Sequence, residues 1–507
     1  MSVELESRFL RLANRRAVRL RDVPTLALDD LRAAVAHGVA AGWRIVSLFG
    51  APESATKLRL IAVLADDDRA QLRAATALVG QRYRALSDEC AQAQRFEREI
   101  AEQCGAIIEA ARPLKPLRRH APTHRPVAWT AEPATDRGPY VFDRVEGDEV
   151  HEVAVGPVHA GIIEPGHFRF QTHGELVLHL EIMLGYQHRG VEPLLESGDR
   201  HGGMLVAESI AGDTVIAHAS AYCGALEALA RAHKSARAQS IRGIALELER
   251  IANHVGDLGA IAGDVAYQPA AAFFGRWRGE CLNMLMSISG NRYGRGLVRP
   301  GGVGFDIPDD MAASLAARVR RLGAELRPIA EVFFGTASVQ SRLEGVGAVP
   351  RAACEEHGFV GLVARACEVA RDVRHDHPYG VYRYAQIPIA TAWAGDVYAR
   401  AMVRWLEVQR SLAFLEEQLG ALPVGDAAVP CGELAPSELV VALEEGWRGE
   451  VAHTVLTDER GRVRRHKVVD PSFHNWPAVM VALPGNQISD FPLCNKSFNL
   501  SYAGHDL

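Results

Sequence analysis

Hydrophobic and polar positions alternate in two stretches near the start of the chain. Residues 43–49 (WRIVSLF) and 57–65 (KLRLIAVLA) have the pattern of strands. The intervening GAPESAT carries the glycine and proline of a turn. A long helical pattern then extends over residues 68–111 and includes RFEREIAEQCG. These patterns predict a small α/β domain over residues 1–111.

The later part of the chain opens with a hairpin and continues mainly as helices. HFRFQT and ELVLHLEIM flank the turn signal His173-Gly174, and HTVLT and RVRRHKVV flank DERG in a second hairpin. An apolar stripe at helical spacing begins at Gly243, and another helix begins after Asp396, which suits an N-cap. The predicted fold class is therefore α+β, with a large, mostly helical domain over residues 140–507 that carries β-hairpins.

A change of composition separates these two units. Residues 112–139 hold six prolines and show no hydrophobic period. Such a segment is typical of a semi-extended, exposed linker. Its basic residues Lys115, Arg118, Arg119 and Arg125 could contact an acidic neighbour, but we expect them to be solvated.

Composition and charge narrow the class of protein. The chain has 507 residues, of which 48% are hydrophobic and 23% charged, and its net charge of −6 argues against nucleic acid as the main partner. No secretory signal is evident, and no apolar run reaches the roughly 18 residues of a membrane span. The eight cysteines contain no Cys-x-x-Cys pair, which favours isolated reduced thiols. We expect a cytosolic protein or a peripheral subunit.

Charged residues within apolar helices and glycine-rich turns are the remaining candidates for function. The chain has no phosphate-binding loop, nucleophile elbow or HExxH motif. An unpaired buried charge is costly, so we expect buried ion pairs, which could relay protons or fix one packing arrangement. The candidates for this network are Glu164, Arg189, Glu192, His218, Arg250, Asp257, Asp372, Asp396, Arg400 and Arg404.

Seven stretches together resemble one protein family. They are GPVHAGIIEPGHFRF, GYQHRGVE, ELERIANHVGDLG, VRPGGV, ARDVRHDHPY, GDVYARAMVRWLE and DPSFHNWPAV. The chain resembles the large subunit of formate hydrogenlyase-type membrane-bound nickel–iron hydrogenases, and equally the complex I large subunit beside the quinone site. FEREIAEQCG makes residues 1–111 resemble the smaller complex I subunit that precedes it.

The resemblance implies a metal site that this sequence does not keep. Hydrogenases of this family hold nickel and iron with two Cys-x-x-Cys pairs, because soft thiolates suit that metal pair. The matching positions here are Ala211 and Thr214 in ESIAGDTVIAH, and Ser501 and Gly504 in NLSYAGHDL. We therefore expect no nickel–iron site and no metal, and we expect the final segment to be a buried plug. His218 matches the family.

The resemblance also suggests roles for residues of the first hairpin. A glutamate there carries protons in hydrogenases, and Glu164 matches it; with no metal beside it, we expect Glu164 to pair with an arginine such as Arg400 or Arg404. The complex I quinone ligands fall near Ile163 and Arg200, so His159 and His201 are the candidates on the quinone side. A quinone would need a cavity between this hairpin and the ESIAGD segment.

Three functions stay open on this basis. The first is a coupling or structural subunit of a membrane-associated redox complex. The second is a quinone-reducing oxidoreductase subunit of complex I type, and the third is a pure scaffold. The resemblance implies an iron–sulfur small subunit and antiporter-like membrane subunits as partners, a peripheral place on the cytoplasmic side of the inner membrane, and no directly bound cofactor except a quinone in the second case.

Overall fold

The computed structural model describes residues 7–112, 114–131 and 140–507. The N-terminal unit is built on an antiparallel sheet of order β1-β6-β5-β4, to which β3 adds in parallel along β6. Helix α2 packs on this sheet, and α3 packs on β4. The elements of this unit are β1 (Leu10–Leu12), β2 (Val18–Arg19), β3 (Thr25–Leu26), α2 (Leu28–Ala40), β4 (Arg44–Pro52), β5 (Leu58–Asp66), β6 (Gln71–Val79), β7 (Arg82–Arg84), α3 (Gln94–Cys104) and β8 (Ile107–Glu109).

The two predicted strands are confirmed as β4 and β5, but the predicted long helix over residues 68–111 is wrong. Its first part is strand β6, which pairs with β5 on one side and with β1 on the other. The run LRAATALV is rich in alanine, a good helix former, yet pairing between two strands buries nearly all of it. Only α3 is an α-helix within the predicted range.

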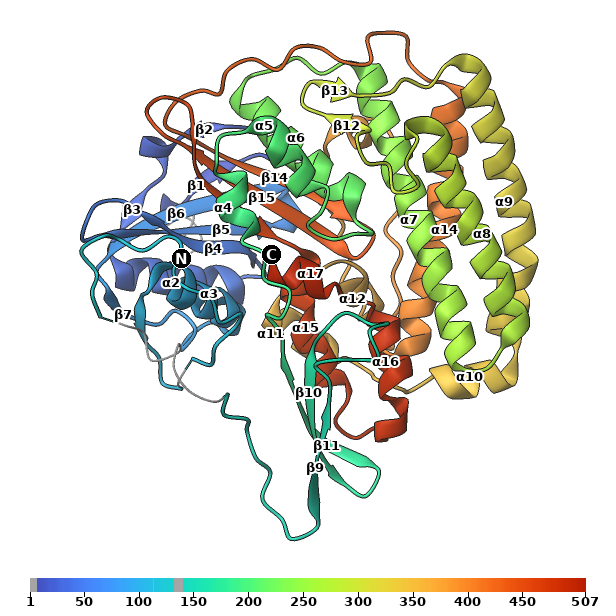
Figure 1. Ribbon diagram of the computed structural model, residues 1–507, viewed down its shortest axis with the longest axis horizontal. Helices are drawn as coiled ribbons and strands as arrows, with labels where there is room; N and C mark the ends of the chain where they lie inside the picture. Colours follow the sequence, from blue (N-terminus) through green and yellow to red (C-terminus); the bar gives the residue numbers. More distant parts are fainter. Residues whose placement is uncertain (1–6, 113, 132–139) are drawn as a thin grey trace.

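The larger unit combines a layer of long helices with a three-stranded and a four-stranded antiparallel sheet and a short two-stranded antiparallel pair (Figure 1). Its elements are β9 (Val150–Val155), β10 (His167–His173), β11 (Leu176–Met183), α4 (Val191–Leu195), α5 (Arg200–Ala207), α6 (Val215–Leu229), α7 (Ala236–Asp264), α8 (Gln268–Ser289), β12 (Val298–Arg299), β13 (Gly302–Val303), α9 (Asp309–Gly335), α10 (Ala337–Leu343), α11 (Arg351–His357), α12 (Gly361–Ala366), α13 (Val373–Asp376), α14 (Val397–Gly420), β14 (Glu438–Gly446), β15 (Gly449–Thr457), β16 (Val463–Val469), α15 (Pro471–Ala482), α16 (Phe491–Phe498) and α17 (Tyr502–Asp506).

Helices α7, α8, α9 and α14 form the helical layer, which lies beside the sheet β16-β15-β14-β2 (Figure 1). Both predicted hairpins are confirmed, as β10–β11 and β15–β16. The Asp396 carboxylate caps α14 as expected, because it accepts a hydrogen bond from the Ala399 amide at 2.7 Å. The α+β class predicted from the sequence is confirmed.

The two units share their cores. Strand β2 of the N-terminal unit joins the edge of the β14–β16 sheet, and Arg44 of β4 makes a 2.5 Å ion pair with Glu450 of β15. Between them, Arg118 of the proline-rich segment is fully buried, so the expectation that its basic residues are all solvated is wrong. Arg118 contacts Glu99 at 2.6 Å and donates to the His505 carbonyl. The segment that looked like a linker is partly core.

None of the helices in the part of the chain that the structure describes has the length and apolar character of a membrane span. The eight cysteines are free thiols, as expected, and all but Cys431 are buried. The C-terminal helix α17 lies in the middle of the molecule, between the N-terminal unit and the helical layer (Figure 1). Leu507, which follows this helix, is 2% exposed.

Candidate functional site

The segments ESIAGDTVIAH and NLSYAGHDL, which the resemblance pairs, lie close together in the structure. The Arg189 guanidinium donates to the carbonyl oxygens of Ser209 and Ile210 at 2.8 and 2.9 Å, and to the Ala503 carbonyl at 3.3 Å. Arg189 thus joins the segment before α6 to helix α17. We call residues 209–214, helix α17 and the residues between them the central site.

A second arginine closes the central site from another side. Arg448, in the β14–β15 turn, forms a two-pronged ion pair with Asp213 at 2.6 and 2.8 Å. It also donates to Thr214 Oγ1 at 3.1 Å and to the Asn499 carbonyl at 2.5 Å.

The four positions that hold cysteine in hydrogenases are occupied by groups with other tasks. Ala211 is a buried methyl, and Thr214 Oγ1 donates to Asp213 at 3.1 Å. Ser501 caps α17 by accepting a hydrogen bond from the Gly504 amide at 2.9 Å. A Cβ on Gly504 would lie 2.6 Å from Asp470 Cγ. A methyl, two hydroxyls and a hydrogen do not fit a nickel–iron centre, which requires thiolates.

Asp470 takes the space that a side chain at residue 504 would need, and it starts a chain of buried rings. His218 Nε2 lies 3.0 Å from Asp470 Oδ2, and His218 Nδ1 lies 3.2 Å from His453 Nε2. His453 Nδ1 lies 2.9 Å from His466 Nε2. Burial raises the pKa of Asp470, but His218 and Arg448 outweigh it, and the pKa lies below its usual value.

Burial lowers the pKa of the last two rings, His453 and His466, because it disfavours the charged form of an imidazole. It lowers the pKa of His453 well below the usual value and that of His466 to about 4. The two rings are therefore neutral at neutral pH. His218 and Asp470 form the polar end of the chain, next to Gly504.

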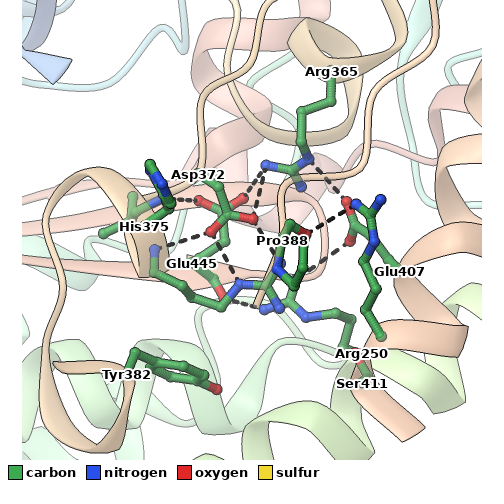
Figure 2. A network of polar contacts seen from close by, with 12 residues as sticks. Arg250, Arg365, Asp372, His375, Tyr382, Pro388, Glu407, Ser411 and Glu445 are labelled. Carbon is green, nitrogen blue, oxygen red and sulfur yellow. Dashed lines mark hydrogen bonds and ion pairs between the residues drawn. The ribbon is translucent and has the colours of Figure 1, made fainter. Parts of the chain in front are cut away.

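A larger ion network fills the space between α7, α14 and the segment before α13 (Figure 2). Arg365 contacts Glu407 at 2.8 Å and Glu445 at 2.7 Å. Arg374 contacts Asp372 at 2.6 Å and Glu247 at 3.1 Å. All six side chains are buried.

Arg250 joins the two halves of this network, because it lies 3.0 Å from Glu247 and 3.7 Å from Glu407. Three arginines here face four carboxylates, so the network has one carboxylate in excess. Burial raises the pKa of Glu445 to about 7 against the opposing charge of Arg365. One proton in this network is therefore exchangeable near neutral pH.

A second network ties the N-terminal unit to the central site. Glu192, 1% exposed, contacts Arg465 at 2.8 Å and Lys467 at 2.9 Å, both on β16. Lys467 also contacts Glu99 of α3 at 2.6 Å, and Glu99 contacts Arg118. The Arg118 bond to the His505 carbonyl then reaches α17.

The structure brings most of the predicted residues into these networks. Asp257 pairs with Arg404 at 2.9 Å and accepts from the Asn499 amide at 2.7 Å, which links α7 and α14 to the central site. The Arg400 guanidinium donates to Ser497 Oγ at 2.8 Å and stacks 3.8 Å from the Phe498 ring. Asp396 caps α14 and also accepts a hydrogen bond from the Gly345 amide at 2.8 Å, so it ties α14 to the segment after α10.

Glu164 does not pair with Arg400 or Arg404 among the contacts of the described residues. It is exposed in the loop before β10, beside the backbone amides of Tyr502 and Ala503 and within the field of Arg448. Arg404 is instead held by Asp257 on the neighbouring helix α7. The expected pairing is therefore wrong, because the loop that carries Glu164 lies against α17 and faces Arg448 rather than α14.

A cavity of about 580 Å³ lies against the first hairpin, and its lining is mainly apolar. His159 and Ile163 line it from the loop before β10, and His159 Nε2 lies 2.8 Å from the Gly166 carbonyl oxygen. Phe491 and Tyr502 form part of the wall. The cavity faces α16 and the end of α7 rather than the ESIAGD segment, which corrects the expected location. The side chain of His201 lies outside the described residues.

Sequence reasoning missed several residues of these networks. The sequence places His453 and His466 in the second hairpin and Asp470 in the stretch DPSFHNWPAV, and none of the three is among the candidates. The candidates also omit Glu247, Arg365, Arg374, Glu407 and Glu445, although all of these except Arg374 are charged residues within an apolar stretch. The available signal was polar residues on both faces of β15 and β16, since a strand with one solvated face alternates.

The comparisons with known proteins agree with this architecture. Residues 264–436 match the family described as the respiratory-chain NADH dehydrogenase 49 Kd subunit. A carbon monoxide-induced hydrogenase of Rhodospirillum rubrum is 31% identical over 350 residues, which cover 69% of this chain and 97% of that protein. Formate hydrogenlyase subunit 5 of Escherichia coli is 30% identical over 398 residues, covering 78% and 69%.

The fold also matches a chain in the structure of a membrane-bound sulfane sulfur reductase, an archaeal respiratory membrane complex. The TM-score is 0.66 at 24% identity, and the match covers 71% of this chain and 99% of the other. At this identity the match speaks for the fold alone. The resemblance predicted from the sequence motifs is confirmed. The chain belongs to the family that comprises the large subunits of membrane-bound hydrogenases and the 49 kDa subunit of respiratory NADH dehydrogenase.

Proposed function

We propose that this chain is the large subunit of a membrane-associated redox complex and that it works without a nickel–iron centre, as a coupling or structural subunit. The observation that carries the proposal is the contact between Gly504 and Asp470. A Cβ at 504 would lie 2.6–2.8 Å from the Asp470 carboxylate, so the position has no room for a thiolate ligand. The partners would be an iron–sulfur subunit and antiporter-like membrane subunits, with the chain peripheral on the cytoplasmic side of the inner membrane.

The ion network supports coupling over a purely mechanical role. It has one carboxylate in excess, and the pKa of Glu445 is raised to about 7 by burial. A proton gained or lost there changes the charge facing Arg365 and, through it, Glu407 on α14. Arg404 and Asp257 connect that helix to α7 and to Asn499 at the central site. A charge change in the core is thereby passed to the segment before α17.

The test of the metal-free role is elemental analysis of the purified complex together with a hydrogen-uptake assay. We expect nickel far below one per chain and no hydrogen turnover. Stoichiometric nickel, or turnover that depends on this chain, would overturn the proposal. Coupling is tested separately with Arg404→Met and Glu445→Gln in the intact complex. Loss of redox-driven ion movement with assembly intact supports coupling, and unchanged activity in both variants supports a scaffold.

A second function, quinone reduction with electrons from a partner's cluster, is favoured by the cavity at the first hairpin. Its volume of about 580 Å³ and its apolar lining with a few polar groups are typical of small-molecule sites. Ile163→Trp would place an indole ring at the wall of the cavity and narrow it, whereas Val158→Trp, on the exposed part of the same loop, would not. Saturable binding of a short-chain quinone that only Ile163→Trp abolishes would support this function. Equal binding in both variants would exclude the cavity as the site.

A further inference from the structure

A small polar cavity lies where the N-terminal unit meets α6, α7 and β14, and none of the functions above uses it. Its volume is about 60 Å³. Arg15 reaches it from the N-terminal unit and Glu444 from β14, and the 3-10 helix η5 (Gly380–Arg383) forms one rim. The charged side chains that line it are Arg15, Lys234, Arg242, Arg383 and Glu444.

Positive charge exceeds negative charge around this cavity. Arg15 pairs with Glu444. Arg242 holds Glu227, which lies just behind the wall, at 2.6 and 3.2 Å, and Lys234 reaches the same carboxylate only at 3.7 Å.

Arg383 donates to the Pro378 carbonyl at 3.3 Å, and no carboxylate of the described residues pairs with it. Four cations therefore share two carboxylates. Arg15, Lys234 and Arg242 are buried or half-buried, and Arg383 is exposed at the rim, so the excess positive charge surrounds the mouth of the cavity and favours a bound anion there.

Two further observations point to a ligand. Ser220 Oγ, on α6, lines the cavity, is 3% exposed and has no hydrogen-bond partner among the described residues. An unpartnered buried hydroxyl is costly, and an anion would accept its hydrogen bond. Burial, and then the charges of Arg15, Arg242 and Arg383, lower the pKa of Lys234 to about 8 although Glu227 opposes them. The Lys234 ammonium is therefore poorly solvated and faces three arginines and one carboxylate.

The size of the cavity restricts the ligand. One water needs about 10–15 Å³ of such space, so about 60 Å³ admits a group of four or five heavy atoms. A tetrahedral oxyanion has that size and a charge that matches the excess. We propose that the cavity binds one small dianionic oxyanion, of the class of inorganic phosphate and sulfate, through Ser220, Lys234 and Arg383. Bound there, the anion would draw the Arg15 segment of the N-terminal unit toward α6 and α7.

The test is calorimetric titration of the full-length protein with sodium sulfate and with sodium phosphate, against sodium chloride at equal ionic strength. We expect one saturable site with a Kd below about 1 mM for the oxyanions and none for chloride. Lys234→Met and Arg383→Met should each weaken binding at least tenfold, and Ser220→Ala about threefold or more. The matched controls Lys57→Met and Arg21→Met, both at exposed positions, should stay within twofold of the unmodified chain.

Sulfate titrations at pH 7 and pH 9.5 provide a second readout, since sulfate keeps its charge over this range. Lys234, which faces Arg15, Glu227, Arg242 and Arg383, loses its proton between these values, so sulfate affinity should fall. Lys234→Met should remove that fall. The proposal is overturned by the absence of saturable binding, by an equal response to chloride, or by rim variants that bind sulfate as the controls do.

Discussion

The Asp470 carboxylate lies where a side chain on Gly504 would have to go, with Cγ 2.6 Å from the ideal Cβ position. The same carboxylate accepts a hydrogen bond from the Ser472 amide at 2.8 Å and lies 3.0 Å from His218. Asp470 is therefore fixed and cannot swing away at low cost. This pair of residues leads directly to the first prediction.

Gly504→Cys should destabilise the protein even though it restores a residue type used by hydrogenases. Overpacking against a fixed buried carboxylate is expected to lower the free energy of unfolding by about 1–3 kcal/mol. Urea unfolding followed by circular dichroism measures the change. Ala503→Cys, at the half-buried neighbouring position, serves as the control and should change stability by less than about 0.5 kcal/mol. Equal stability of the two variants would refute the packing argument.

Removing Arg365 from the ion network should lower the free energy of unfolding of the protein. Arg365→Met leaves Glu407 and Glu445 as buried carboxylates without their closest cation, which typically costs about 3–5 kcal/mol. Adding Glu445→Gln should recover part of this loss, because one uncompensated charge disappears. Arg351→Met, which breaks an exposed pair with Glu355, should cost less than about 1 kcal/mol. Chemical unfolding of all four chains compares these values.

Glu249 should make the protein less stable as pH rises. Burial raises its pKa to about 8, although the Ile216 and Ala217 amides donate to it. Between the ordinary value of 4.5 and about 8, the folded state keeps a proton that the unfolded state has lost, so its stabilising effect fades over this interval.

Glu249→Gln is neutral at every pH and should remove this contribution. The variant's stability relative to the parent chain is expected to increase from pH 5 to pH 8, by up to about 1.4 kcal/mol per pH unit. Urea unfolding at pH 5, 6.5 and 8 provides the comparison. Parallel stability curves for the two chains would show that Glu249 ionises normally.

His474 should contribute to acid sensitivity. Burial, and then the charges of Arg44 and Arg95, lower its pKa to about 3. The folded state keeps the ring neutral while the unfolded state takes up a proton below about 6.5, so stability is lost as pH falls from 6.5 toward 3. His474→Phe keeps the ring against Phe96 and Phe473. It should lose less stability between pH 7 and pH 5 than the parent, whereas His37→Phe, at an exposed position of α2, should behave as the parent does.

Local patterns predicted the elements whose partners are close in sequence. The Asp396 cap and both hairpins depend on a few neighbouring residues, and all three are confirmed. Strand β6 was missed because its alanine-rich run prefers a helix until β1 and β5 pair with it on both sides. That information lies outside the run itself.

In the candidate site, too, local motifs could be predicted from the sequence, whereas contacts between distant segments could not. The resemblance identified Ala211, Thr214, Ser501 and Gly504 as the positions that match the family's cysteines. The structure adds the groups that these four residues contact. Asp470 could not be predicted as the neighbour of Gly504, since only the packing of α17 on α15 brings them together. The arginine partners of the carboxylates were likewise unpredictable, because α7, α14 and β14 are far apart along the chain and meet only in the folded core.

The 2.5 Å contact between Arg44 and Glu450 joins two units that composition alone would separate. Pulling them apart would expose this pair together with Glu99, Lys467 and the buried edge of β14, so neither half is complete by itself. We therefore expect differential scanning calorimetry of the intact chain to give a single endotherm rather than two. The N-terminal unit and the larger unit would then unfold as one cooperative unit, so that a destabilising change in either of them lowers the melting temperature of both.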